Sequence, residues 1–174
     1  MQINMIDRFF ELFIEATARI PAHYFQLPVA EKQEPMYRER VYCYELYHQL
    51  RTLLERERSL AEYMLSGEID KQGHPIIRQC APDFVLHAPG GMDHNLVVIE
   101  VKPVNASQEG IRKDIETLEY FLSEHVGYKR GIQLVYGNDQ AWFSRFMEVY
   151  HRAGLQHVQL FWHQYPGQPA TFIL

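Results

Sequence analysis

The hydrophobic residues of this chain recur first at helical spacing and then at the spacing of strands. Residues 5–19 carry apolar side chains on one side and acids on the other, which predicts a helix that Pro21 ends. Residues 22–36 contain two prolines and show no clear period, so they are expected to form a connecting segment. A second helix is expected over residues 37–58, with an apolar side and five arginines on its other sides.

After the second helix the pattern changes to short apolar runs separated by turn residues. Residues 60–69 are expected to form a strand that ends in a turn at 70–73. Residues 83–88 and 95–102 flank glycines, which predicts a hairpin, and the second run is apolar on both faces, as in a covered central strand. The later elements are expected to be a helix over 107–125 capped by Asn105 or Ser107, a strand over 131–136, a helix over 139–153 with an acidic N-cap, and strands over 157–163 and 171–174. This order in a single domain of 174 residues predicts an α/β sandwich, with a central mixed β-sheet flanked by helices on both faces.

The predicted hairpin brings charged side chains together at one end of the sheet. Side chains alternate along a strand, so Glu100 and Lys102 share a face, and a bulge-free register places Asp83 opposite Glu100 at roughly 4.5–5.5 Å between Cβ atoms. Two partly buried carboxylates at that distance repel, so one must take up a proton or both must share a cation. Mg²⁺ suits such hard oxygen ligands, and Lys102 beside it is expected to have a lowered pKa and to orient or deprotonate a water.

The pairing of Pro82-Asp83 with Glu100-Val101-Lys102 across a hairpin resembles the motif of the PD-(D/E)xK nuclease superfamily, which has the restriction-endonuclease-like fold. The resemblance covers roughly residues 37–137, with 1–36 and 138–174 as additions to the nuclease-like core. It implies hydrolysis of DNA phosphodiester bonds with Mg²⁺ or Mn²⁺, leaving a 5′-phosphate and a 3′-hydroxyl. Asp83 and Glu100 would hold the metal, and Lys102 would position the attacking water.

The same resemblance implies a further acid on the helix before the sheet, and Glu45 matches that position. Glu45 would then be a third metal-binding and catalytic residue. The Gln-x3-Tyr signature of the exonuclease branch is absent, because Gln108 and Tyr120 do not have its spacing. Two cysteines are too few for the branch that carries an iron–sulfur cluster.

Charge limits how this chain can bind nucleic acid. Its 17 basic and 22 acidic residues give a net charge of -5, which argues against binding by bulk charge alone. We therefore expect weak intrinsic affinity for DNA, or help from a homodimer or a partner protein. Candidate phosphate contacts are Arg51, Arg112 and Lys113, with an ordinary solvated face as the alternative for each. No secretory signal and no apolar run long enough to cross a membrane are seen, so a cytoplasmic protein is expected.

Two other interpretations of the sequence remain open. The three motif residues can form a structural ion-pair network at a sheet edge, without chemistry. The chain can also be a catalytically inactive binding or assembly module on the same fold, within a larger complex. In that case the apolar side of residues 5–19 would be an interface rather than part of the core.

Overall fold

A computed structural model describes residues 4–31, 33–67, 81–90 and 94–174. Its centre is one six-stranded sheet in the order β1 to β6, made of β1 (Met64–Gly67), β2 (Phe84–His87), β3 (Asn95–Pro103), β4 (Arg130–Tyr136), β5 (Val158–His163) and β6 (Thr171–Phe172). Strands β1, β2 and β3 are antiparallel, β3, β4 and β5 are parallel, and β6 is antiparallel to β5. The predicted mixed sheet is confirmed.

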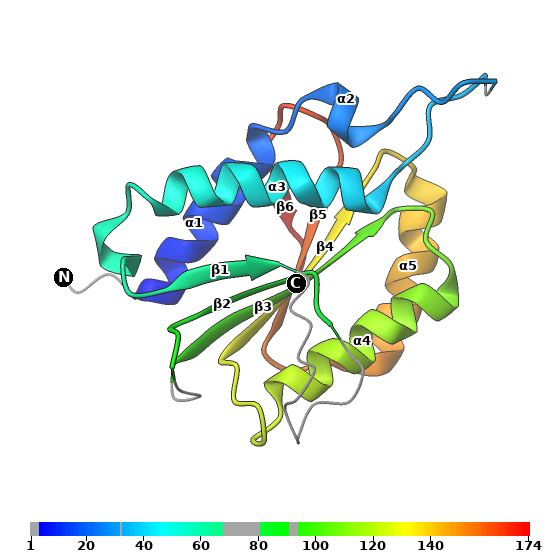
Figure 1. Cartoon of the computed structure of the whole chain (residues 1–174). Coiled ribbons are helices and arrows are strands. Elements are labelled where there is room, and N and C mark those ends of the chain that lie inside the picture. The colour runs from blue at the N-terminus through cyan, green and yellow to red at the C-terminus, as the bar shows by residue number, and fades with distance from the viewer. Residues whose placement is uncertain (1–3, 32, 68–80, 91–93) are drawn as a thin grey trace.

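Helices cover both faces of this sheet, as the sequence predicted (Figure 1). Helices α1 (Met5–Ala18) and α3 (Glu39–Leu54) pack on one face, and the short α2 (Ala22–Phe25) contacts α3. Helices α4 (Gln108–Leu122) and α5 (Gln140–Ala153) pack on the other face and form the crossovers that parallel strands require. The predicted caps are also confirmed: Ser107 accepts a hydrogen bond at the start of α4, and Asp139 does so at the start of α5.

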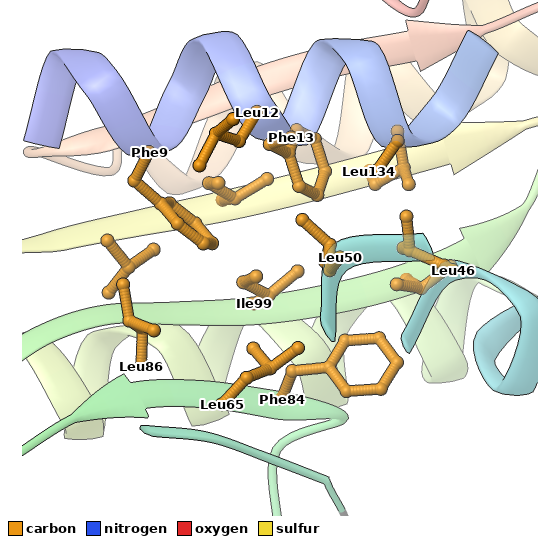
Figure 2. Close-up of a cluster of buried hydrophobic side chains, with 14 of the residues drawn as sticks. Phe9, Leu12, Phe13, Leu46, Leu50, Leu65, Phe84, Leu86, Ile99 and Leu134 are labelled. Atoms are coloured by element: carbon orange, nitrogen blue, oxygen red, sulfur yellow. The ribbon is translucent and has the colours of Figure 1, made fainter. Parts of the chain in front are cut away.

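The core on the α1 side shows that the apolar side of the first helix is not a free interface (Figure 2). Phe9 and Phe13 of α1 are fully buried with Leu50 of α3, and the ring of Phe13 meets that of Phe161 edge-on at 5.4 Å. The suggestion that this helix serves as an interface is therefore wrong. Its apolar side covers the sheet, because burial of these aromatic rings is worth several kcal/mol in total, at roughly 25 cal/mol per Å².

Strand β3 alternates between the two cores. Val97, Ile99 and Val101 pack on the side of α1 and α3, whereas Val98 packs against Leu118 of α4. The prediction of a central strand covered on both faces is confirmed. The same alternation directs the side chains of residues 100 and 102 to the α4 side of the sheet.

Several element boundaries differ from the prediction. The second helix ends at Leu54 and is followed by a 3₁₀ turn, η1 (Arg58–Leu60), so β1 begins at Met64 rather than at residue 60. The connecting segment contains α2 and a single antiparallel bridge between Leu27 and Met36. The turn predicted at 70–73 lies outside the described residues, as does the tip of the hairpin at 91–93.

None of the helices in the described part of the chain combines the length and apolar character needed to cross a membrane.

Candidate functional site

The hairpin register sets the position of the two motif acids. Phe84 pairs with Ile99, so one step further along the ladder Asp83 lies opposite Glu100, as predicted. The register shifts between Leu86 and His87, so the hairpin is not free of bulges as expected. This irregularity lies on the turn side of the site, and the pairs from Leu86↔Val97 to Phe84↔Ile99 keep the predicted register up to Asp83.

The carboxylate of Asp83 is fixed against the neighbouring strand. Its Oδ2 accepts a hydrogen bond from the backbone N–H of Val101 at 2.7 Å. Burial raises the pKa of Asp83 to about 6, although the charge of Lys102 and the Val101 hydrogen bond both oppose the rise. The side chain is thus held in place but resists ionisation.

Glu100 is more deeply buried, at 4 % exposed. Burial raises the pKa of Glu100 well above its ordinary value, and the nearby charges of Asp114 and Asp83 raise it further. The predicted repulsion between the paired carboxylates is therefore present, and in the protein alone it favours a bound proton.

Lys102 is the centre of the charged cluster. Its Nζ lies 3.1 Å from Oδ1 of Asp114 and 3.0 Å from Oε2 of Glu39. Burial lowers the pKa of Lys102, but the charges of Asp114, Glu39 and Asp83 outweigh that effect and raise it above its ordinary value. The expectation of a lowered pKa was made for a metal-bound site, and in the protein alone the shift has the opposite direction. Lys102 is therefore a cation and a hydrogen-bond donor at neutral pH.

Asp114, on α4, is the acid that the sequence reasoning missed. It is 3 % exposed, and burial raises its pKa to about 7 against the opposing charge of Lys102. A signal was present in the sequence: Asp114 follows Ile111 by three residues and precedes Leu118 by four, which puts a carboxylate on the apolar side of the helix. An acid on that side is costly unless it has a partner.

Gln133 is a second missed residue. It is fully buried on β4 directly beside Glu100, and its Nε2 lies 3.4 Å from both the Glu100 carbonyl oxygen and Oδ2 of Asp114. Within the described residues its Oε1 is buried without a hydrogen-bond partner. A polar residue in the middle of the apolar strand at 131–136 was the available signal.

The helical acid that contacts the cluster is Glu39, not Glu45. Glu39 lies in the first turn of α3 and pairs with Lys102, whereas Glu45 accepts a hydrogen bond from Gln49 at 2.6 Å. Six residues at about 3.6 per turn rotate Glu45 roughly 240° around the helix from Glu39. Glu39 was missed because an acid in a first helical turn is common for reasons of the helix dipole alone.

The three predicted phosphate contacts are exposed side chains on α3 and α4. Arg51 pairs with Glu55 at 3.0 Å, which matches the solvated-face alternative. Arg112 lines a separate shallow cleft with Arg152 between α4 and α5, and Lys113 is exposed. Whether any of them contacts DNA stays a prediction.

A cleft of about 390 Å³ opens beside the cluster, between α3 and the ends of β1 and β2. Asp83 lines it together with Glu39, Arg40, Cys43, Tyr44, Tyr47, Gly67 and Phe84. A substrate in this cleft would therefore reach one of the motif carboxylates directly.

Asp83 and Glu100 are oxygen ligands of the kind that a small hard cation prefers, but they are only two. Within the described residues no group of three or more His, Cys, Asp and Glu side chains is arranged to hold a metal ion. Mg²⁺, however, typically uses one or two protein carboxylates and completes its shell with water and phosphate oxygens. Asp83 and Glu100 supply such a pair. Burial is the largest cause of their raised pKa values and the charge of Lys102 opposes it, so a further cation beside them would favour the ionised carboxylates. The residues present therefore fit the ion.

Neither the models of known protein families nor the curated proteins include a match to this chain. The site must therefore be interpreted from its own geometry.

Proposed function

We propose that this chain is a metal-dependent nuclease that hydrolyses phosphodiester bonds in DNA, on a restriction-endonuclease-like sandwich. The observation that carries the proposal is the convergence of Asp83, Glu100 and Lys102 at one end of the sheet. The order of α3, three antiparallel strands, α4 and a parallel strand also agrees with the order expected from the PD-(D/E)xK resemblance.

Asp83 and Glu100 would hold Mg²⁺ or Mn²⁺. The bound ion supplies a Lewis acid for a phosphate oxygen and lowers the pKa of a coordinated water. The Val101 N–H keeps the Asp83 carboxylate oriented, so little rearrangement is needed before substrate binds. Glu45 is hydrogen-bonded to Gln49, whereas Glu39 is the acid of α3 paired with Lys102, so Glu45 is omitted from this set.

Lys102 acts in this proposal as a donor rather than as a base. Because its pKa is raised, its ammonium can donate to the attacking water or to a phosphate oxygen at neutral pH. Two carboxylates on different helices, Glu39 and Asp114, hold Nζ from two directions. They are positioning residues, since they act through Lys102.

The net charge of -5 makes tight binding of DNA by one copy unfavourable. A homodimer would supply two active sites related by two-fold symmetry, one for each strand of a duplex. A partner protein that delivers the DNA is the other arrangement consistent with the charge.

The direct test is cleavage of supercoiled plasmid and of labelled single-stranded DNA with Mg²⁺ or Mn²⁺. Lys102→Met keeps most of the side-chain volume and removes the ammonium, so we expect it to lose at least about 100-fold in rate, the usual scale for a positioned proton donor. Lys129→Ala is the matched control, because Lys129 is an exposed lysine beside the start of β4, at the opposite end of the sheet. Equal cleavage by wild type and Lys102→Met, with both folded by circular dichroism, would reject the assignment.

A further inference from the structure

The cleft beside Asp83 has the size and shape of a ligand site. Its volume of about 390 Å³ lies within the range of roughly 300–1,000 Å³ that is usual for small-molecule pockets. One wall is a single side of α3, formed by Arg40, Cys43, Tyr44 and Tyr47 at successive helical spacings. The opposite wall is Phe84 and the backbone of Gly67.

The two walls of the cleft carry flat aromatic surfaces. The rings of Tyr47 and Phe84 are nearly parallel, with centroids 6.0 Å apart, and the Tyr47 hydroxyl donates to the Leu65 carbonyl at 3.3 Å. Tyr44 is 63 % exposed although it lines the cleft, so its ring contributes little to the core. An exposed ring beside a fixed aromatic wall is the arrangement on which unpaired bases stack.

The charged end of the cleft is continuous with the proposed catalytic cluster. Asp83 belongs to both, and Glu39, which pairs with Lys102, lines the cleft next to Arg40. From Glu39 to Tyr47 is eight residues, or roughly 12 Å along the helix axis. Tyr44 is closer, at five residues from Glu39 or roughly 7.5 Å along the axis. A nucleotide whose phosphate lies near Asp83 would therefore have Tyr44 within reach of its own base or that of the next nucleotide.

From these observations we propose that the cleft binds an unpaired nucleobase next to the scissile phosphate, an inference that rests on the proposed nuclease function. A paired base inside a duplex has both faces covered by its neighbours and cannot enter. The substrate is therefore single-stranded DNA, or duplex DNA from which one base is extruded.

Fluorescence anisotropy tests this with three labelled probes: a single strand, its blunt duplex, and the duplex with one bulged nucleotide. Ca²⁺ replaces Mg²⁺, and a gel verifies that each probe stays intact. We expect Tyr44→Ala to weaken binding of the unpaired probes by about 5- to 150-fold, the loss of one stacked base, and to leave the blunt duplex unchanged. Tyr44→Phe should restore binding, because stacking needs the ring and not the hydroxyl.

Tyr165→Ala is the control, since Tyr165 is also exposed but lies outside the residues that line the cleft. If only the single strand binds in a way that depends on Tyr44, the substrate is single-stranded DNA. If the bulged duplex also binds in this way, the cleft also accepts a base extruded from a duplex. Binding of the blunt duplex as tightly as the single strand, or no effect of Tyr44→Ala, would overturn the proposal. The nuclease assignment fails separately: it fails if the wild type shows Tyr44-dependent binding but no cleavage with Mg²⁺ or Mn²⁺.

Discussion

The buried carboxyl of Asp114 should make the free energy of unfolding depend on pH. In the folded chain its pKa is raised to about 7, mainly by burial, from an ordinary value of 3.8. Between those two values the folded chain holds a proton that the unfolded chain has released. The free energy of unfolding therefore rises as the pH falls through about 7, and this contribution is lost as the pH rises again.

Asp114→Asn removes this titration while keeping an acceptor for Gln133. At about pH 7 the folded chain holds about half a proton more than the unfolded chain, and by pH 5 it holds nearly one more. The gain over these two units is therefore about 2 kcal/mol, at roughly 1.4 kcal/mol per unit for a whole proton. Wild type should gain about 2 kcal/mol over the variant across that range. The loss of Asp114 also lowers the pKa of Glu100, which makes the variant less dependent on pH and adds to the difference.

Urea unfolding followed by circular dichroism at several pH values measures the difference. His163 has its pKa lowered to about 4 by burial, so it contributes in the opposite direction, but both proteins contain it and its effect cancels. Glu119→Gln is the control for the loss of one carboxylate from the same helix, because Glu119 is exposed. If the wild-type minus Asp114→Asn difference in unfolding free energy does not change with pH, or falls as the pH falls, Asp114 does not take up a proton on folding.

Three further predictions follow from the core, the backbone and the metal site. Phe13→Ala should lower the free energy of unfolding in urea by about 3–5 kcal/mol, because Phe13 is fully buried. Phe172→Ala should lower it by about 1 kcal/mol or less, because that ring is 55 % exposed. Equal losses would contradict the role of α1 as part of the core. Gly137→Ala should lower the free energy of unfolding more than Gly154→Ala, although both glycines have positive φ. A Cβ at residue 137 would lie 2.6 Å from the side chain of Val104, whereas a Cβ at residue 154 would meet no atom within 4 Å. Similar unfolding free energies for the two variants would contradict this. Mg²⁺ should raise the thermal midpoint of wild type and not that of Glu100→Gln, because the substitution removes one of the two proposed carboxylate ligands, and an equal rise in both would count against Glu100 as a ligand.

The fold was predictable because its signals are local. The run around Val97–Ile99, apolar on both faces, located the central strand, and Ser107 and Asp139 marked helix starts by an interaction within one turn. The boundaries of α3 and β1 were not predictable to the same degree, because no residue near Leu54 or Met64 signals a stop as Pro21 does. Tertiary packing decides such ends.

The candidate site was predictable only where the hairpin determines it. Asp83 pairs with Glu100 because of the register between β2 and β3, which can be predicted from the number of residues between the two strands. Glu39 and Asp114 reach Lys102 from helices whose rotation and position depend on the assembled sheet. Glu45 matches the position of the helical acid that the resemblance implies, but its hydrogen bond is to Gln49 in the next turn, and Glu39 is the acid of α3 that pairs with Lys102.

The central claim is that paired carboxylates at the end of this sheet support metal-dependent hydrolysis of DNA. The most direct measurement compares cleavage of an end-labelled single-stranded oligonucleotide by wild type with Mg²⁺, wild type with EDTA, and Glu100→Gln with Mg²⁺. We expect 3′-hydroxyl products, which a polymerase can extend, in the first reaction only. Cleavage that persists in EDTA or in Glu100→Gln, or no cleavage by wild type with either Mg²⁺ or Mn²⁺, would rule out this assignment.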